Sequence, residues 1–268
     1  MMQEKPSFFE RLNQKLRESL TIKLLTIGVL ILLLLIPLEM VQSLIRERNY
    51  RNQSTIREVS QEWSGEQVIN GPVVSVPYYS YEKTTVNEVE KVIRVTRYMH
   101  LMPDDLKFEG ELFPKTLHRG IYDVVVYEGD FSVKGSFNLA ELRNQQIKAD
   151  LILWNEATIN IGISDMRGIT DQIKMSIGDS SFNFLPGLQH VGMPSAGVHS
   201  AFPLLGDEGM VNFSFDLNLK GSSSVSFVPL AKTTDVHLAS TGNSPSFYGS
   251  FLPADRNIAN GFTATWKV

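Results

Sequence analysis

An apolar run near the N-terminus sets the first limit on how this chain can fold. The segment from Leu24 to Leu38 reads LLTIGVLILLLLIPL and contains no charged residue. Continuing to Ile45 extends the run to twenty-two residues, with Glu39 as its single charge. Because a helix of about 20 residues crosses a hydrocarbon core of about 30 Å, the run predicts one transmembrane α-helix with Glu39 at the membrane interface.

Two other interpretations of this run are weaker. A cleavable signal peptide begins with a short basic segment and ends at a small-x-small cleavage site. Here more than twenty residues precede the apolar core, and the residues from Glu39 to Gln42 offer no such site. A buried helix of a soluble protein would rarely be so uniformly leucine and isoleucine. We therefore expect an uncleaved signal anchor.

The residues flanking the run suggest its orientation and its neighbours. Basic residues are slightly more frequent before the span than after it, so the positive-inside rule favours a cytoplasmic N-terminus and a main domain outside the cytoplasm. We expect residues 1–21 to form a cytoplasmic or interfacial amphipathic segment, or simply to extend the span. Residues 22–45 would form the transmembrane helix, and residues 46–65 a helical stalk that lifts the domain off the bilayer and ends near Gly65.

From Gly71 onwards the apolar residues alternate with polar ones, as in GPVVSVPYYSY and MVNFSFDLNLK. A period of two with β-branched and aromatic residues is typical of strands with one buried face. Residues 66–268 are therefore predicted to be mainly β, an antiparallel β-sandwich-like domain. The segments 127–130 (YEGD) and 220–222 (KGS) are predicted to be tight turns between strands.

One stretch of this domain, from Ser180 to Gly206, carries no charged residue. Its three prolines argue against a second membrane helix, and we expect an ordered loop packed on the domain. Long loops of this kind are often functional. One hypothesis is a binding surface for a lipid, a glycan or a peptide, formed by five apolar side chains: Phe182, Phe184, Leu185, Val191 and Phe202. A purely structural loop is the alternative.

The sequence offers little for catalysis or cofactor binding. The chain has no cysteine and a formal net charge of −4, which excludes thiol chemistry and gives no basic surface for nucleic acid. We find no zinc-protease, nucleophile-elbow or phosphate-loop motif, so we expect neither a cofactor nor an enzymatic activity. A metal site at His190 and His199, or a hydrolase, would need further groups from elsewhere in the fold. Asp165 and Arg167 are expected to form a structural ion pair.

Several segments, taken in order, resemble the CreD family of bacterial inner-membrane cell-envelope integrity proteins. They include LLLLIPLEMVQSLIRERNYR, GPVVSVP, RGIYDVVVYEGDFSVKGSF, SDMRGI, PGLQHVGMPSAGVHS and SPSFYGSFLPADRNIANGFTATW. The resemblance implies a contribution to envelope integrity and stress responses, with no catalytic motif to transfer. It also implies a longer protein, whose extracytoplasmic domain is followed by further membrane helices. Expected partners are therefore the lipid bilayer, other envelope proteins and those further helices.

Overall fold

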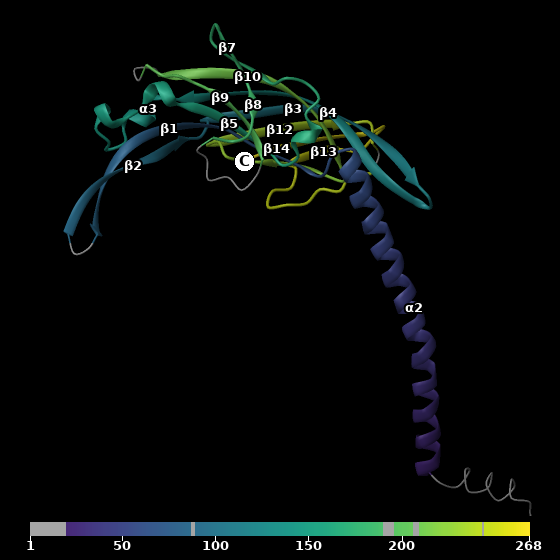
Figure 1. Cartoon of the computed structure of the whole chain (residues 1–268). Coiled ribbons are helices and arrows are strands. Elements are labelled where there is room, and N and C mark those ends of the chain that lie inside the picture. The colour runs from purple at the N-terminus through teal and green to yellow at the C-terminus, as the bar shows by residue number, and fades with distance from the viewer. Residues whose placement is uncertain (1–19, 87–88, 190–195, 206–208, 243) are drawn as a thin grey trace, which may run out of the picture. The chain divides into compact units, whose positions relative to one another are not determined.

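The computed structural model describes residues 20–86, 89–189, 196–205, 209–242 and 244–268 (Figure 1). The chain divides into two compact units, residues 1–54 and residues 55–268. The predicted amphipathic segment at residues 1–21 lies outside the described residues, apart from its last two positions.

A single long helix, α2 (Leu20–Glu62), covers the predicted span and all but the last three residues of the predicted stalk without a break. Pro37 lies inside it, where the missing amide donor costs one backbone hydrogen bond. Among the described helices, α2 is the one that is long and apolar enough to cross a membrane, with a mean hydropathy of 2.7 in its most apolar window. The sequence-based prediction of one long apolar N-terminal helix is confirmed, and its length and composition are sufficient for a membrane span.

The β domain contains two sheets, so the predicted mainly β, antiparallel architecture is confirmed. The smaller sheet has the order β11-β1-β5-β9-β8, with β2 also paired to β1. Its strands are β1 (Gln67–Val86), β2 (Val89–Leu101), β5 (Thr158–Ile163), β8 (Leu185–Pro186), β9 (Gly197–Ala201) and β11 (Val225–Val228). All its pairings are antiparallel except that of β1 with β11, which is parallel.

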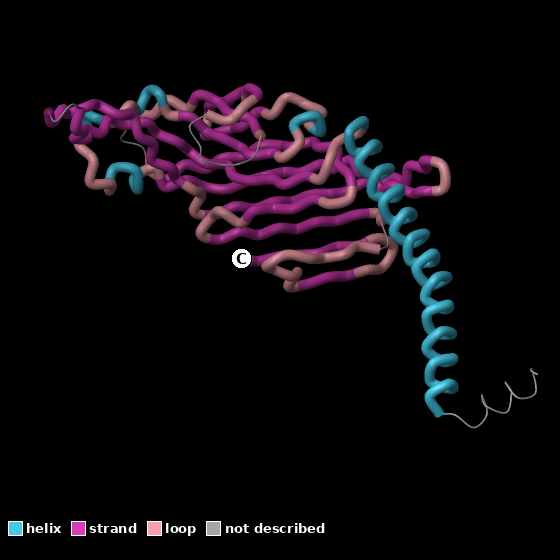
Figure 2. The backbone as a smooth tube through the Cα atoms, turned by 60° about the horizontal axis from the view of Figure 1, so that its bottom comes forward, coloured by secondary structure: helices cyan, strands magenta, loops and turns pink. Residues whose placement is uncertain are grey.

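The larger sheet has the order β13-β14-β12-β3-β4-β10-β6-β7, and Figure 2 shows long strands side by side. Its strands are β3 (Asp105–Arg119), β4 (Tyr122–Asn138), β6 (Lys174–Ile177), β7 (Ser180–Asn183), β10 (Met210–Ser222), β12 (Thr233–Ser240), β13 (Asp255–Asn257) and β14 (Phe262–Lys267). Here too one pair, β3 with β12, is parallel.

The core consists of side chains from both sheets, as the period-two pattern requires. In β12, burial alternates strictly along the strand, whereas every residue of the central strand β5 is buried. Ile69 and Ile161 of the smaller sheet belong to the same buried cluster as Phe131, Val133 and Leu217 of the larger one. Short helical turns lie in the connections: α3 (Ala140–Arg143), η1 (Ala149–Leu151), η2 (Trp154–Glu156) and η3 (Met166–Gly168).

Two of the predicted turns are wrong, because both segments lie inside strands. Residues 127–130 are part of β4, and residues 220–222 end β10. The glycines there serve close packing: a Cβ at Gly129 would meet the ring of Phe131, and one at Gly221 would meet the ring of Tyr127. The chain turns after β10 at Ser223, whose φ is 64°.

The uncharged stretch 180–206 is also more regular than expected. The prediction of a loop is wrong for much of it, because β7, β8 and β9 lie within this stretch. Strand β9 pairs with β5 in the smaller sheet, while β7 pairs with β6 in the larger one. The uncharged stretch therefore contains strands of both sheets.

Candidate functional site

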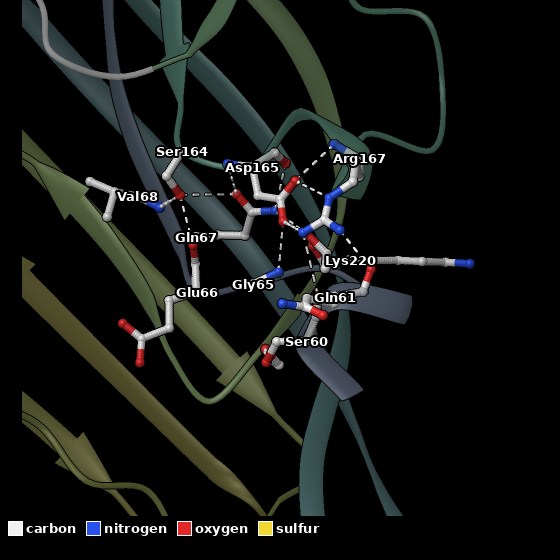
Figure 3. A network of polar contacts seen from close by, with 12 residues as sticks. Ser60, Gln61, Gly65, Glu66, Gln67, Val68, Ser164, Asp165, Arg167 and Lys220 are labelled. Carbon is white, nitrogen blue, oxygen red and sulfur yellow. Dashed lines mark hydrogen bonds and ion pairs between the residues drawn. The ribbon is translucent and has the colours of Figure 1, made fainter. Parts of the chain in front are cut away.

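The end of α2 is fixed to the β domain by a network of polar contacts (Figure 3). We call this region the junction and define it as residues 55–68 together with residues 164–168. All of these residues belong to the compact unit 55–268. Three elements meet here: the last turns of α2, the start of β1 and the short helix η3.

An ion pair lies at the centre of the junction, as expected from the sequence. Arg167 donates from Nη2 to Oδ2 of Asp165 at 2.6 Å and from Nε to Oδ1 at 2.9 Å. The main-chain N–H of Gly65 also donates to Oδ2, at 2.8 Å. The hydrogen bonds from Arg167, and then from the Gly65 amide, hold the pKa of Asp165 well below its usual range despite partial burial. Asp165 is therefore a carboxylate at any physiological pH.

The same arginine caps the C-terminal end of α2. Its Nη1 donates to the carbonyl oxygen of Gln61 at 2.6 Å, and its Nη2 lies 3.5 Å from that of Ser60. The last carbonyls of a helix have no intrahelical donor and carry partial negative charge, which a cation stabilises. The last turn of α2 contains no basic residue of its own. Arg167 of η3 thus supplies the positive charge that the last turn of α2 lacks.

Gln67, the first residue of β1, joins the two sheets from inside the junction. Its side chain is fully buried, and its Nε2 lies within 3.0 Å of Ser64 Oγ, the Asp165 carbonyl oxygen and the Lys220 carbonyl oxygen. Its Oε1 accepts from the main-chain N–H of Asp165 at 3.3 Å. Gly168 permits this arrangement, because a Cβ there would meet both Nε2 of Gln67 and the Lys220 carbonyl.

Apolar packing accompanies these polar contacts. Val59 of α2 is buried against Val124 and Val126 of β4, with Ile56 and Trp63 packed alongside. Nε1 of Trp63 donates weakly to the carbonyl of Tyr127 at 3.4 Å, and the ammonium of Lys220 lies 4.9 Å from the centre of the Trp63 indole ring. The end of α2 therefore has its own small hydrophobic cluster on the larger sheet.

A second feature of the domain is an open groove of about 950 Å³. It lies between β11, the last strand of the smaller sheet, and β3, β4, β12 and β14 of the larger sheet. Residues 241–251, with position 243 outside the described part, border it. None of its 29 lining residues has a charged side chain. We call this feature the uncharged groove.

Of the five apolar residues proposed from the sequence, the four in the described part of the chain do not line this groove. Phe184 and Phe202 are buried core residues, and Phe182 is half-buried with its ring edge-on to Phe202 at 5.3 Å between centres. Leu185 is exposed on β8, and Val191 lies outside the described residues. The structure brings Phe182 and Phe202 together but gives Leu185 a different environment. A common binding surface for all five stays a prediction.

The described histidines have simple surroundings. Nδ1 of His100 lies 3.0 Å from Oγ of Ser75, and burial lowers the pKa of His100. Nδ1 of His118 lies 2.5 Å from Oδ1 of Asp123 on the surface. Of the four histidines in the described part of the chain, none contacts both a serine and a carboxylate through the hydrogen bonds of the structure. His190 lies outside that part, and no metal-binding cluster occurs among the described residues.

The comparisons with known proteins agree with one another. A family model described as "Inner membrane protein CreD" matches residues 19–268. The inner membrane protein CreD of Escherichia coli (strain K12) is 31% identical over 244 residues, which cover 88% of this chain and 52% of that relative. The chain thus spans about half the length of the curated relative it matches.

Proposed function

Since the chain belongs to the CreD family of inner membrane proteins, we propose that it is a non-catalytic anchor that supports envelope integrity by holding a β domain at the membrane. In this proposal α2 crosses the inner membrane with its N-terminus in the cytoplasm, and the β domain lies in the periplasm. The slight excess of basic residues before the span supports this orientation.

The observation that carries the proposal is the junction. An anchor must resist separation of its membrane helix from the folded domain. At the junction Arg167 caps α2 and pairs with Asp165, while Gln67 connects β1 to β10. The end of α2 is therefore part of the folded domain rather than a free linker, and motion of the helix end would break its hydrogen bonds to Arg167 of η3 and Ser222 of β10.

Orientation can be tested by labelling, because the chain has no cysteine. A Ser181→Cys variant places one thiol at an exposed position of β7. A membrane-impermeant maleimide added to intact spheroplasts should label this variant fully, whereas a Ser7→Cys variant should react only after lysis. Labelling of Ser7→Cys without lysis, with protection of Ser181→Cys, would contradict the orientation.

The anchoring role can be tested in cells that lack their own copy of the gene. Uptake of N-phenylnaphthylamine, or detergent sensitivity, reports envelope permeability. The full chain should lower permeability, and an Arg167→Ala variant expressed at the same level should do so less effectively. Arg256→Ala, an exposed arginine on β13, is the matched control and should behave like the unaltered chain. If both variants lowered permeability to the same extent, the junction would not be the carrier of function.

A further inference from the structure

The uncharged groove lies where the smaller sheet ends. Strand β11 pairs only with β1 among the described strands, so its other side is an edge. Phe227 of β11 packs against Phe108 and Phe131 of the larger sheet, with ring centres 5.0 and 5.7 Å apart. Beyond this contact Phe247 packs edge-on against Phe262 and Trp266 of β14, and the described residues of 241–251 border the groove. The groove occupies the space left between them.

The lining restricts what can occupy this space. Val225, Val236, Leu238, Phe262 and Trp266 supply its apolar walls, and no charged side chain is present to pair with an ion. Moving an unpaired charge out of water into such a lining is strongly unfavourable. The part of any occupant that lies within the groove is therefore neutral and largely apolar.

One polar group in the lining has no partner. Oγ1 of Thr234 is buried and forms no hydrogen bond in the structure, and the residue as a whole is 2% exposed. Thr234 lies on the same face of β12 as Val236 and Leu238, which also line the groove. Buried hydroxyl groups normally have partners. An occupant that carries a neutral carbonyl oxygen next to its apolar part would supply the missing acceptor once the Thr234 side chain turns its hydroxyl towards the groove.

The rim of the groove is apolar as well. Residues 241–254 carry no charge, and Tyr248, Phe251 and Leu252 within them are 67%, 51% and 68% exposed. Exposed apolar clusters of this kind mark interaction sites, and aromatic side chains are enriched at membrane–water interfaces. In an inner membrane protein, the abundant molecule with a long apolar chain and a neutral ester carbonyl is a phospholipid.

We propose that the uncharged groove binds one acyl chain of a membrane phospholipid, with an ester carbonyl close to Thr234. The volume of about 950 Å³ is within the usual range for small-molecule pockets. An extended peptide added to the edge of β11 is the competing occupant. The lack of charge and the exposed aromatic rim favour the lipid. This proposal requires only that the protein resides in the membrane, and it does not depend on the anchoring role.

The test is native mass spectrometry of the full chain released from detergent and titrated with dipalmitoyl phosphatidylethanolamine. The unaltered chain should retain one lipid more than a Ser226→Phe variant, which adds a ring at a groove-lining position of β11, and the variant's apparent affinity should fall at least tenfold. Ser181→Phe, on exposed β7 outside the groove, is the matched control and should retain lipid like the unaltered chain. Lipids bound around α2 should be common to all three proteins.

A second variant keeps the test valid if Ser226→Phe disturbs folding. Ser250→Trp lies at an exposed rim position and should also lose the additional lipid, with unchanged circular dichroism. Identical lipid retention by the unaltered chain and both groove variants would overturn the proposal. A bound peptide mass, present in the unaltered chain and lost in both groove variants in place of lipid, would overturn it in favour of strand addition at β11. Neither outcome would bear on the permeability assay of the junction.

Discussion

Arg167 donates a hydrogen bond to the main-chain carbonyl of Gln61 across 106 positions of sequence, at 2.6 Å. Through this contact a residue of the β domain closes the C-terminal end of the helix that enters it. The same guanidinium holds Asp165, so one side chain serves both as helix cap and as ion-pair partner. Loss of the Arg167 guanidinium would therefore remove the helix cap and the ion pair together.

Replacing Gln67 by leucine should destabilise the β domain by about 3 kcal/mol. The variant would leave the buried carbonyls of Asp165 and Lys220 without this donor, and a buried polar group without a partner costs about 1–3 kcal/mol. Urea unfolding of the full chain in a mild detergent, followed by tryptophan fluorescence, measures the change. Gln146→Leu, at an exposed position, should alter the free energy of unfolding by less than about 0.5 kcal/mol. Similar effects of the two substitutions would contradict the structure of the junction.

The contribution of Asp165 to stability should depend on pH. Its folded-state pKa is lowered from the ordinary value of 3.8, chiefly by the hydrogen bond from Arg167. The unfolded chain therefore takes up the proton first as the pH falls, and the stabilisation is complete above the unfolded pKa and lost below it. An Asp165→Asn variant should be less stable than the unaltered chain at pH 7. The difference between their free energies of unfolding should narrow as the pH falls below about 4. A difference in the free energy of unfolding that stays constant from pH 7 to pH 3 would show that the charge of Asp165 does not contribute to stability.

Gly129→Ala should be destabilising, although this glycine has an ordinary strand conformation. The added methyl group would meet the ring of Phe131 and the side chain of Leu112 in the core, and overpacking of this kind costs about 1–3 kcal/mol. Thermal unfolding followed by circular dichroism measures the loss. Gly209→Ala, which has no neighbouring atom within 4 Å, is the control and should leave the unfolding temperature nearly unchanged.

Glu39→Gln should leave membrane insertion intact. The carboxylate lies 3.4 Å from Arg46 in an exposed ion pair, and exposed pairs contribute about 0–1 kcal/mol. The apolar run before Glu39 is already sufficient for a membrane span. Extraction of membranes at alkaline pH should leave the variant in the pellet, as for the unaltered chain. Its release into the supernatant would show that Glu39 is required for anchoring.

The architecture could be predicted from periodicity, since strands with one buried face alternate regardless of their partners. The turns could not be predicted in this way, because a glycine that a turn requires and a glycine that close packing requires look alike in a sequence. Gly129 and Gly221 stand next to polar residues, as turn glycines do, but they are needed because the rings of Phe131 and Tyr127 occupy the space of their missing side chains. That requirement becomes visible only when the core is assembled.

The functional regions were predictable to different degrees. The pairing of Asp165 with Arg167 follows from their closeness in sequence, but the capping of Gln61 depends on the folded path of the chain. The uncharged groove combines five strands and a loop, and each contributes ordinary residues. Its signal in the sequence is the absence of charge from Thr241 to Ala254, a shorter run than the uncharged stretch that begins at Ser180.

The two parallel strand pairs have a consequence for how the protein folds during synthesis. Gln67 of β1 is in register with Val225 of β11, and Asp105 of β3 is in register with Thr233 of β12. Pairings so distant in sequence form slowly, and strand edges left open in the meantime are prone to aggregation. A nascent chain that has not yet reached β11 therefore carries two incomplete sheets.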